Sequence, residues 1–314
     1  MGTRKIAFVF PGQGSQAVGM GRDAAARLAV ANELMERADS VLGFSLKALC
    51  FDGPEDQLKQ TENTQPALYA SSAATLAVLA DAGIRAEAVA GHSLGEYTAL
   101  YAAGCFDFAT GLKLVRTRGE AFAKAGAARP GAMAAIMGLD VPQVLAICAA
   151  ASKDGKVAVA ANINDPNQIV ISGDPEAVNA ACEGAKAAGA KRALPLPVSG
   201  AFHSPLVAPA AEIMRAALAE AAFSAPTVTF VNNVDAAVLT DPTAIKDSLV
   251  RQVTGSVRWV ESVERLAALG VTDYVEVGSG KVLGGLIRRI HKEAVCHTTE
   301  SNASIDKTIE ALKS

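Results

Sequence analysis

The stretch that most constrains the fold of this chain is residues 86–103, where a short apolar run meets a glycine-serine turn and then a helical pattern. The turn reads Gly91-His92-Ser93-Leu94-Gly95, a G-x-S-x-G sequence. Glycines on both sides of the serine let the backbone pass sharply from a strand into a helix and lift the hydroxyl out of the sheet. This order predicts an α/β fold with Ser93 as a candidate nucleophile. An ordinary turn that contains a serine by chance is the alternative.

The same strand, loop and helix pattern occurs near both ends of the chain. Residues 5–10 predict a compact apolar strand that runs into a glycine-rich loop and a helical stretch reaching residue 38. Residues 273–277 predict another strand, followed by a loop and a helix over residues 282–291. Such alternation is typical of a mostly parallel sheet that is covered by helices.

A cluster of chain-breaking residues at 127–131 marks a change of pattern. The segment after it predicts the order β-α-β-β-α-β, which is that of the split ferredoxin-like module. We therefore expect a small ferredoxin-like domain over residues 128–199, inserted into a large α/β domain of residues 1–127 and 200–314. The predicted small-domain elements are strands at 132–137, 157–162, 169–172 and 192–198, helices at 141–151 and 175–188, and a turn at 164–167.

Composition excludes several classes of function. The chain has 314 residues, 50% of them hydrophobic, which allows about two domains. A formal net charge of -3 gives no basic excess for binding nucleic acid. The 5 cysteines include no C-x-x-C pair, which favours reduced thiols over disulfides or a zinc site. The longest apolar stretch, residues 66–80, is interrupted by polar residues and is short for a membrane span, so we expect a cytoplasmic protein.

Two glycine-rich loops raise the alternative of phosphate binding. Residues 12–17 satisfy the dinucleotide pattern G-x-G-x-x-A, but residues 22–38 keep a helical texture where a second strand ending in an acid is required. The loop at Gly280 lacks the earlier glycine of a Walker site, because Val275 stands there, and Val282 replaces the hydroxyl residue. Both loops can be simple packing turns, and the first can also present amides to an oxyanion beside the serine.

A serine nucleophile needs a base, and the chain has 4 histidines. His92 adjoins the serine and should point to the opposite side of the strand, His291 ends a basic helix, and His297 lies in a polar stretch. His203 remains, in a loop between the two expected domains, where a cleft can form. Its position alone leaves a structural capping role equally open.

Several motifs occur together in this chain: F-P-G-Q-G-S-Q at residues 10–16, G-H-S-L-G-E at residues 91–96, Arg118-Gly119, and G-A-F-H-S at residues 200–204. In order and spacing, along nearly the whole chain, they resemble the malonyl-CoA:acyl carrier protein transacylases of fatty acid synthesis, a group within the acyltransferase domain family. The resemblance implies a large α/β-hydrolase-like domain beside the small ferredoxin-like domain.

The resemblance also implies roles for individual residues. Ser93 would be the nucleophile, and His203 its base and later its acid. Arg118 would bind the malonyl carboxylate, which suits a planar and permanently charged guanidinium. Without the resemblance, an exposed helix salt bridge is the simpler interpretation of Arg118. The backbone amides of Gln13 and Leu94 would form the oxyanion hole.

Two further roles follow from the same resemblance. The main-chain carbonyl of Gln252 would accept a hydrogen bond from His203, in place of a triad carboxylate. On sequence alone, an ordinary polar residue at a helix end explains Gln252 equally well. Leu94 and Phe202 resemble the malonyl-selective pattern rather than the methylmalonyl pattern.

Together these roles imply transfer of a malonyl group from malonyl-CoA to the phosphopantetheine thiol of acyl carrier protein through an O-malonyl serine, supplying fatty acid elongation. No metal or bound cofactor is needed. The expected partners are malonyl-CoA and acyl carrier protein, without nucleic acid or membrane, and we expect a monomer. The alternatives are a serine esterase or thioesterase, an acyltransferase of a polyketide pathway, and an inactive subunit that binds carrier protein.

Carrier proteins are usually acidic, so basic clusters are candidate docking sites. Solvated helix faces are the alternative interpretation of such clusters. The two clusters are Arg288, Arg289 and Lys292, and Lys186, Lys191 and Arg192.

Overall fold

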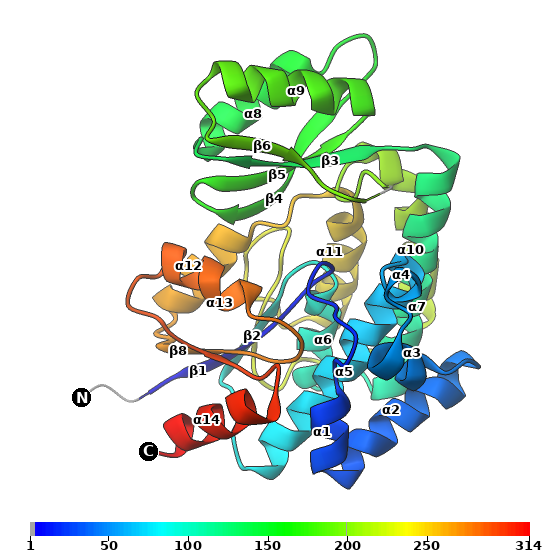
Figure 1. Ribbon diagram of the computed structural model, residues 1–314, viewed down its shortest axis with the longest axis vertical. Helices are drawn as coiled ribbons and strands as arrows, with labels where there is room; N and C mark the ends of the chain where they lie inside the picture. The colour runs from blue at the N-terminus through cyan, green and yellow to red at the C-terminus, as the bar shows by residue number, and fades with distance from the viewer. Residues whose placement is uncertain (1–3, 199) are drawn as a thin grey trace.

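The structure, a computed structural model, describes residues 4–198 and 200–314. Residues 1–3 and Ser199, which ends the expected small domain, therefore lie outside the described residues. The chain forms one parallel and one antiparallel sheet, which lie in separate parts of the molecule (Figure 1). The predicted α/β class, with a mostly parallel sheet and a second smaller sheet, is confirmed at this level.

The parallel sheet has the strand order β7-β2-β1-β8-β9. The register pairs Phe10 with Gly91 and Val9 with Glu276, so the carboxyl ends of the three central strands meet at one edge. Both faces of the central strand are buried, which explains its continuous apolar sequence. The strands are β1 (Ile6–Phe10), β2 (Ala88–Gly91), β7 (Thr229–Val231), β8 (Asp273–Glu276) and β9 (Val295–Thr298).

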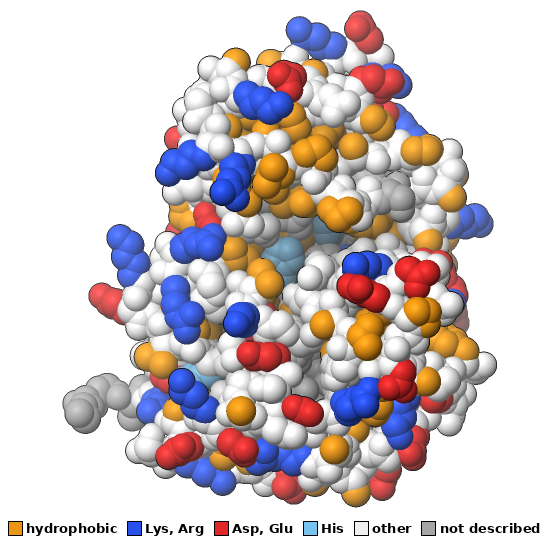
Figure 2. Space-filling model, viewed as in Figure 1, with side chains coloured by type: hydrophobic (Ala, Val, Ile, Leu, Met, Phe, Trp, Pro, Cys, Tyr) orange, Lys and Arg blue, Asp and Glu red, His pale blue; other side chains and the backbone are white. Residues whose placement is uncertain are grey.

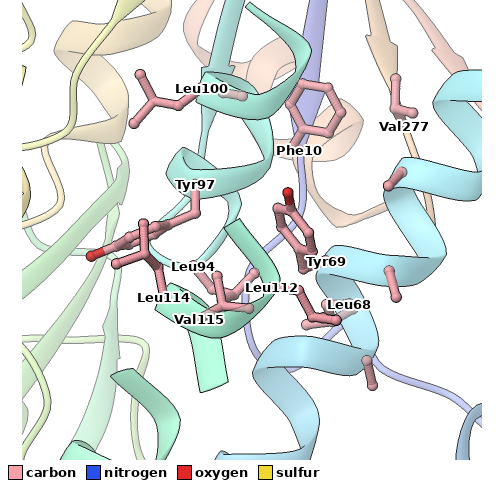
Figure 3. Packing of buried hydrophobic residues seen from close by; sticks show 14 of the residues in the cluster. Phe10, Leu68, Tyr69, Leu94, Tyr97, Leu100, Leu112, Leu114, Val115 and Val277 are labelled. Carbon is pink, nitrogen blue, oxygen red and sulfur yellow. The ribbon is translucent and has the colours of Figure 1, made fainter. Parts of the chain in front are cut away.

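Helices cover both faces of the parallel sheet. Phe8 and Phe10 face a large core, in which Figure 3 shows Leu68 and Tyr69 of one long helix near Leu112 of another. The helices on that side are α1 (Arg22–Arg27), α2 (Ala29–Leu42), α3 (Leu46–Asp52), α4 (Glu55–Leu58), α5 (Thr61–Asp81), α6 (Gly95–Ala102), α7 (Phe108–Ala128), α10 (Ala208–Glu220), α11 (Pro242–Thr254) and α14 (Asn302–Lys313), with a short 3-10 turn η1 (Pro205–Val207). The opposite face packs on α12 (Trp259–Ala268) and α13 (Val282–Ile290).

The antiparallel sheet has the order β4-β5-β3-β6 and its own apolar core against two helices. Its elements are β3 (Ala132–Met137), α8 (Val141–Ala151), β4 (Ala158–Asp165), β5 (Gln168–Gly173), α9 (Pro175–Ala187) and β6 (Arg192–Pro195), which follow one another in the predicted order. The opposite face of this sheet contributes Met133, Ala135 and Val170 to the large core.

Several predicted boundaries are wrong. The helical stretch that was expected to run to residue 38 is divided at Leu28, whose backbone is extended. Asn164 and Asp165 belong to β4 rather than to the turn. The last strand of the antiparallel sheet ends at Pro195, and Pro197 has no N–H with which to continue a ladder toward residue 198.

A short chain segment joins the two sheets. The Val257 amide donates to Ala161 O of β4 (2.8 Å), and the Ile163 amide donates back to Val257 O (2.9 Å). Within residues 4–198 and 200–314, no helix has both the length and the apolar character that crossing a membrane requires.

Candidate active site

Ser93 lies in the turn between β2 and α6 with a φ of 52°, a left-handed conformation that is uncommon for serine. A Cβ atom at Gly91 would overlap the backbone of Gly95, and one at Gly95 would overlap the carbonyl of Phe10. The G-x-S-x-G spacing is thus required because the turn packs against itself and against the end of β1.

His203 lies beside this serine, with its Nε2 2.8 Å from Ser93 Oγ. Its other ring nitrogen, Nδ1, lies 2.8 Å from the main-chain oxygen of Gln252 and 3.1 Å from that of Gly255. Because carbonyl oxygens only accept, Nδ1 carries the hydrogen and Nε2 can accept from the serine hydroxyl. The capping role that the sequence left open for His203 is filled by Ser204, whose side chain accepts from Leu206 N.

The environment of His203 keeps its imidazole neutral. The ring is buried, and burial is the main cause that lowers the pKa of His203 to about 3, with the nearby charge of Arg118 as a second cause. The hydrogen bond to Gln252 O partly opposes this shift in pKa. A neutral imidazole with a free Nε2 lone pair has the form of a general base.

Arg118 of α7 is 1% exposed and reaches the same serine. Its Nη2 donates to Ser93 Oγ (3.0 Å) and to Gln252 Oε1 (2.9 Å), and its Nη1 donates to Gln65 Oε1 (2.9 Å). The guanidinium lies over the ring of Phe122 at 4.6 Å. The interpretation of Arg118 as an exposed salt bridge is therefore wrong, because the side chain is buried and its acceptors are neutral.

A buried cation whose direct hydrogen-bond partners are all neutral can bind an anion. Within the described part of the chain, Arg118 forms no ion pair, and its Nε has no acceptor. Because a buried charge is costly, and because Arg118 has no carboxylate in direct contact, an anionic ligand at this position would be stabilised by the existing arrangement.

The glycine-rich loop after β1 packs directly on the serine turn. The His92 amide donates to Phe10 O (3.0 Å), and Gly12 lies so close to the His92 carbonyl that a Cβ would overlap it. Neither the Gln13 amide nor the Leu94 amide donates to an acceptor among the described residues. The Ser93 amide, in contrast, donates to Asn233 Oδ1 (2.8 Å).

A groove of about 460 Å³ opens beside the site. It lies between the start of α5, the end of α7 and the segment after β6, and it includes Gln13, Phe122 and Phe202. In the space-filling view, the surface is hollowed between the two parts of the molecule, with histidine side chains visible in the hollow and hydrophobic ones above them (Figure 2). The site can thus be reached by a ligand with an extended arm.

The other histidines have different partners. His92 Nε2 lies 2.7 Å from Asn164 Oδ1 of β4, His291 Nδ1 lies 3.1 Å from Tyr274 Oη, and His297 Nε2 lies 3.0 Å from Asp273 Oδ1. Among the described residues, no group of three or more His, Cys, Asp or Glu side chains could bind a metal ion.

Sequence reasoning missed three polar residues that surround the site. Gln65, Glu96 and Asn233 are all buried and contact Arg118, Gln252 or Ser93. The one available signal was their polarity beside apolar sequence, since Gln65 directly precedes the apolar stretch of residues 66–80 and Glu96 belongs to the elbow motif.

The family model, the similar sequences and the similar solved structures all belong to acyltransferases. The family model described as "Acyl transferase domain" matches residues 7–304. The chain is 49% identical over 287 residues to the malonyl CoA-acyl carrier protein transacylase of Escherichia coli (strain K12), covering 91% of this chain and 93% of that protein. A crystal structure of an acyl carrier protein S-malonyltransferase from Vibrio cholerae has a TM-score of 0.93 and 47% identity, covering 97% of this chain and 99% of the other. A malonyl-transacylase in complex with a type II PKS acyl-carrier protein has a TM-score of 0.94 and 41% identity, covering 98% and 99% of the two chains.

Proposed function

The chain belongs to the acyl transferase domain family, among the malonyl CoA-acyl carrier protein transacylases, and we propose that Ser93, His203 and Arg118 perform its chemistry. The enzyme transfers a malonyl group from malonyl-CoA to acyl carrier protein. The observation that supports these residue roles most strongly is the contact of Ser93 Oγ with both His203 Nε2 (2.8 Å) and Arg118 Nη2 (3.0 Å).

In the first step, Ser93 Oγ attacks the thioester carbonyl carbon while its proton passes to His203 Nε2. The developing oxyanion accepts from the amides of Gln13 and Leu94, which have no acceptor among the described residues. The C–S bond then breaks, and the CoA sulfur takes the proton from His203. An O-malonyl serine remains.

The second step reverses these events with another thiol. The phosphopantetheine thiol of the carrier protein gives its proton to His203 and attacks the serine ester, after which the proton returns to Ser93 Oγ. The main-chain oxygens of Gln252 and Gly255 keep the imidazole oriented through both steps, since each accepts from Nδ1. They replace the carboxylate of a conventional triad.

Arg118 selects the acyl group in this proposal. The malonyl carboxylate pairs with the buried guanidinium, which positions the thioester carbonyl near Ser93 Oγ. The neutral acceptors around Arg118 support this role, because they orient the cation without neutralising it.

The domain description belongs to the same proposal. The two sheets, each with a core of its own, support a large α/β-hydrolase-like domain of residues 1–127 and 200–314 and a small ferredoxin-like domain of residues 128–199. We also propose a cytoplasmic monomer that needs no cofactor. The free thiols of Cys50, Cys105, Cys148, Cys182 and Cys296 are compatible with a reducing compartment.

The acceptor distinguishes this function from hydrolysis. Purified enzyme is incubated with malonyl-CoA, with or without phosphopantetheinylated acyl carrier protein, and the products are separated by mass spectrometry. We expect malonyl-carrier protein, and a malonyl adduct on Ser93 when the carrier is omitted. Release of malonate at the same rate with or without carrier protein would instead establish a thioesterase, and failure to trap an adduct at Ser93 would favour an inactive carrier-binding subunit.

A further inference from the structure

One buried acid next to the serine turn has no role in the reaction described above. Glu96, in the first turn of α6, is 0% exposed. Its Oε2 accepts from Gln252 Nε2 (2.6 Å) and from the Asn233 amide (3.3 Å), whereas its Oε1 has no partner among the described residues. Burial raises the pKa of Glu96 to about 8 against these hydrogen bonds. Removing a carboxyl group from water has a cost in free energy, so a buried one with few partners is expected to have a specific function.

The side chain of Gln252 connects Glu96 to the site. Its Oε1 accepts from Arg118 Nη2 (2.9 Å), and its Nε2 donates to Ser93 O (2.9 Å) as well as to Glu96 Oε2 (2.6 Å). The main-chain oxygen of the same residue accepts from His203 Nδ1. The side chain and the main chain of Gln252 therefore serve different parts of the site.

The groups around the Gln252 side chain determine which end of its amide is the oxygen and which is the NH₂ group. In the reverse orientation, the amide oxygen would face Ser93 O, which can only accept, and the NH₂ group would face the donating guanidinium of Arg118. Glu96 Oε2 would also lose the N–H that it accepts from in the observed orientation. Glu96 lies three residues after Ser93, in the first turn of the helix that the serine turn leads into, so its carboxyl group is held close to the nucleophile.

The orientation of Gln252 matters most after the serine has been acylated. Arg118 donates to Gln65 Oε1, Gln252 Oε1 and Ser93 Oγ in the free enzyme. Once Ser93 Oγ becomes an ester oxygen, it is a poorer acceptor, so the two glutamine side chains remain to orient the guanidinium. Of these two, Gln252 is the one whose orientation depends on a buried acid.

We propose that Glu96 is a positioning residue for acyl selection: by accepting from Gln252 Nε2 it fixes the Gln252 amide, which orients Arg118 toward a carboxylated acyl group. The proposal rests on the function proposed above for Arg118. Glu96 itself does not contact the substrate in this role.

The test compares kcat/KM for malonyl-CoA and acetyl-CoA in variants of the full chain. Glu96→Leu removes the acceptor, Glu96→Gln keeps an oxygen that can accept from Gln252, and Gln252→Ala removes the side chain but keeps the main-chain carbonyl. We expect the malonyl-to-acetyl ratio to fall about tenfold in E96L and in Q252A, and to stay within about threefold of wild type in E96Q. The double variant E96L/Q252A should resemble each single variant, because both changes break one connection.

Glu276→Leu is the matched control. Glu276 is also a buried carboxyl, at the end of β8, but it accepts from the amides of Leu283 and Gly284 and not from Gln252. We expect E276L to lower the melting temperature without changing the malonyl-to-acetyl ratio.

Equal losses on both substrates in E96L and Q252A, or a ratio that falls about a hundredfold in the double variant, would overturn the proposal. If E96L does not fold, Q252A decides, because it keeps the Glu96 carboxyl in place. An unchanged malonyl-to-acetyl ratio in Q252A then overturns the proposal, since Glu96 is proposed to act through the Gln252 side chain. An unchanged ratio in E96L and Q252A beside a large loss of selectivity in Arg118→Ala overturns only the role of Glu96. An unchanged ratio in Arg118→Ala overturns the proposed function of Arg118 itself.

Discussion

In the proposed mechanism, selectivity depends on Arg118, a buried cation whose direct hydrogen-bond acceptors are neutral. Replacing it with alanine should reduce kcat/KM for malonyl-CoA about 100-fold, because a desolvated charge pair with the substrate carboxylate is lost. Acetyl-CoA has no carboxylate and should lose far less. Steady-state kinetics with both thioesters measure the effect, and a parallel loss on both would contradict the role.

The pH dependence of acylation reports on His203. Burial lowers the pKa of this imidazole to about 3, so the neutral form that can accept the serine proton prevails well below the ordinary histidine range. We expect the single-turnover rate of acylation by malonyl-CoA to be nearly constant from about pH 5 to pH 7, since His203 does not titrate there. Rapid quenching followed by mass spectrometry of Ser93 gives this rate, and a fall to half near pH 6.5 would show that the imidazole titrates normally.

At the residue scale, the sequence could predict the side chains that lie in recognisable motifs but not those that orient them. Motif spacing predicted Ser93, whereas the role of Arg118 followed only from the resemblance to the acyltransferases. The structure brings both Arg118 and His203 to Ser93 Oγ. In the sequence, Glu96 stands in the first turn of a helix, where acids are common, and nothing in a helical pattern indicates that one polar side chain points inward. Its partner Gln252 is 156 residues away, and a hydrogen bond over that separation depends on the whole sheet.

The serine turn is the element on which the site depends most. At Gly95 a methyl group would overlap the carbonyl of Phe10 at the end of β1. Gly95→Ala should therefore separate the turn from the loop that contains Gln13 and abolish transfer, with a loss of stability of about 1–3 kcal/mol from overpacking. Urea unfolding and transfer assays measure the two effects.

Gly285→Ala is a suitable comparison for that variant. Gly285 lies in α13, where a Cβ would meet no atom within 4 Å beyond its chain neighbours and the backbone of its own helix. Alanine there should leave transfer unchanged and stabilise the helix slightly. Full activity in Gly95→Ala would show that the close packing of turn and loop is not needed.

At the element scale, strands and helices were predictable where apolar runs are bounded by glycine or proline. The strands at the centre of the parallel sheet are buried on both faces, and their apolar sequences already indicated this. Boundaries within alanine-rich sequence were not predictable, as at Leu28, where α1 and α2 separate although helix propensity continues through both.

At the scale of the whole molecule, the parallel and antiparallel sheets are connected next to the active site. The segment after α11 pairs with β4 through Val257, and it includes Gly255, whose carbonyl accepts from His203. His92 adds a hydrogen bond to Asn164 of the same strand. From these contacts we expect the position of the antiparallel sheet to affect the orientation of His203.

The ion pair between Arg289 and Asp165 provides a test of this coupling. Arg289 was considered above as a docking residue for an acidic partner, but its Nη1 pairs with Asp165 Oδ2 (2.6 Å), and the Asp165 side chain is only 4% exposed. Arg289→Ala leaves that carboxylate without its cation between α13 and β4. We expect a loss of about 1–3 kcal/mol in the free energy of unfolding, and a lower kcat for transfer because β4 contacts the segment that orients His203.

Arg288→Ala is the control, since Arg288 is the neighbouring cation on the same helix and donates to Cys296 O of the parallel sheet instead. It should change stability little and leave kcat intact. Asp165→Asn in the Arg289→Ala background should restore part of the stability, because the unpaired buried charge is then removed. If Arg289→Ala instead raised KM for the carrier protein with kcat and stability unchanged, Arg289 would be a docking residue, and the two sheets would not be coupled through this pair.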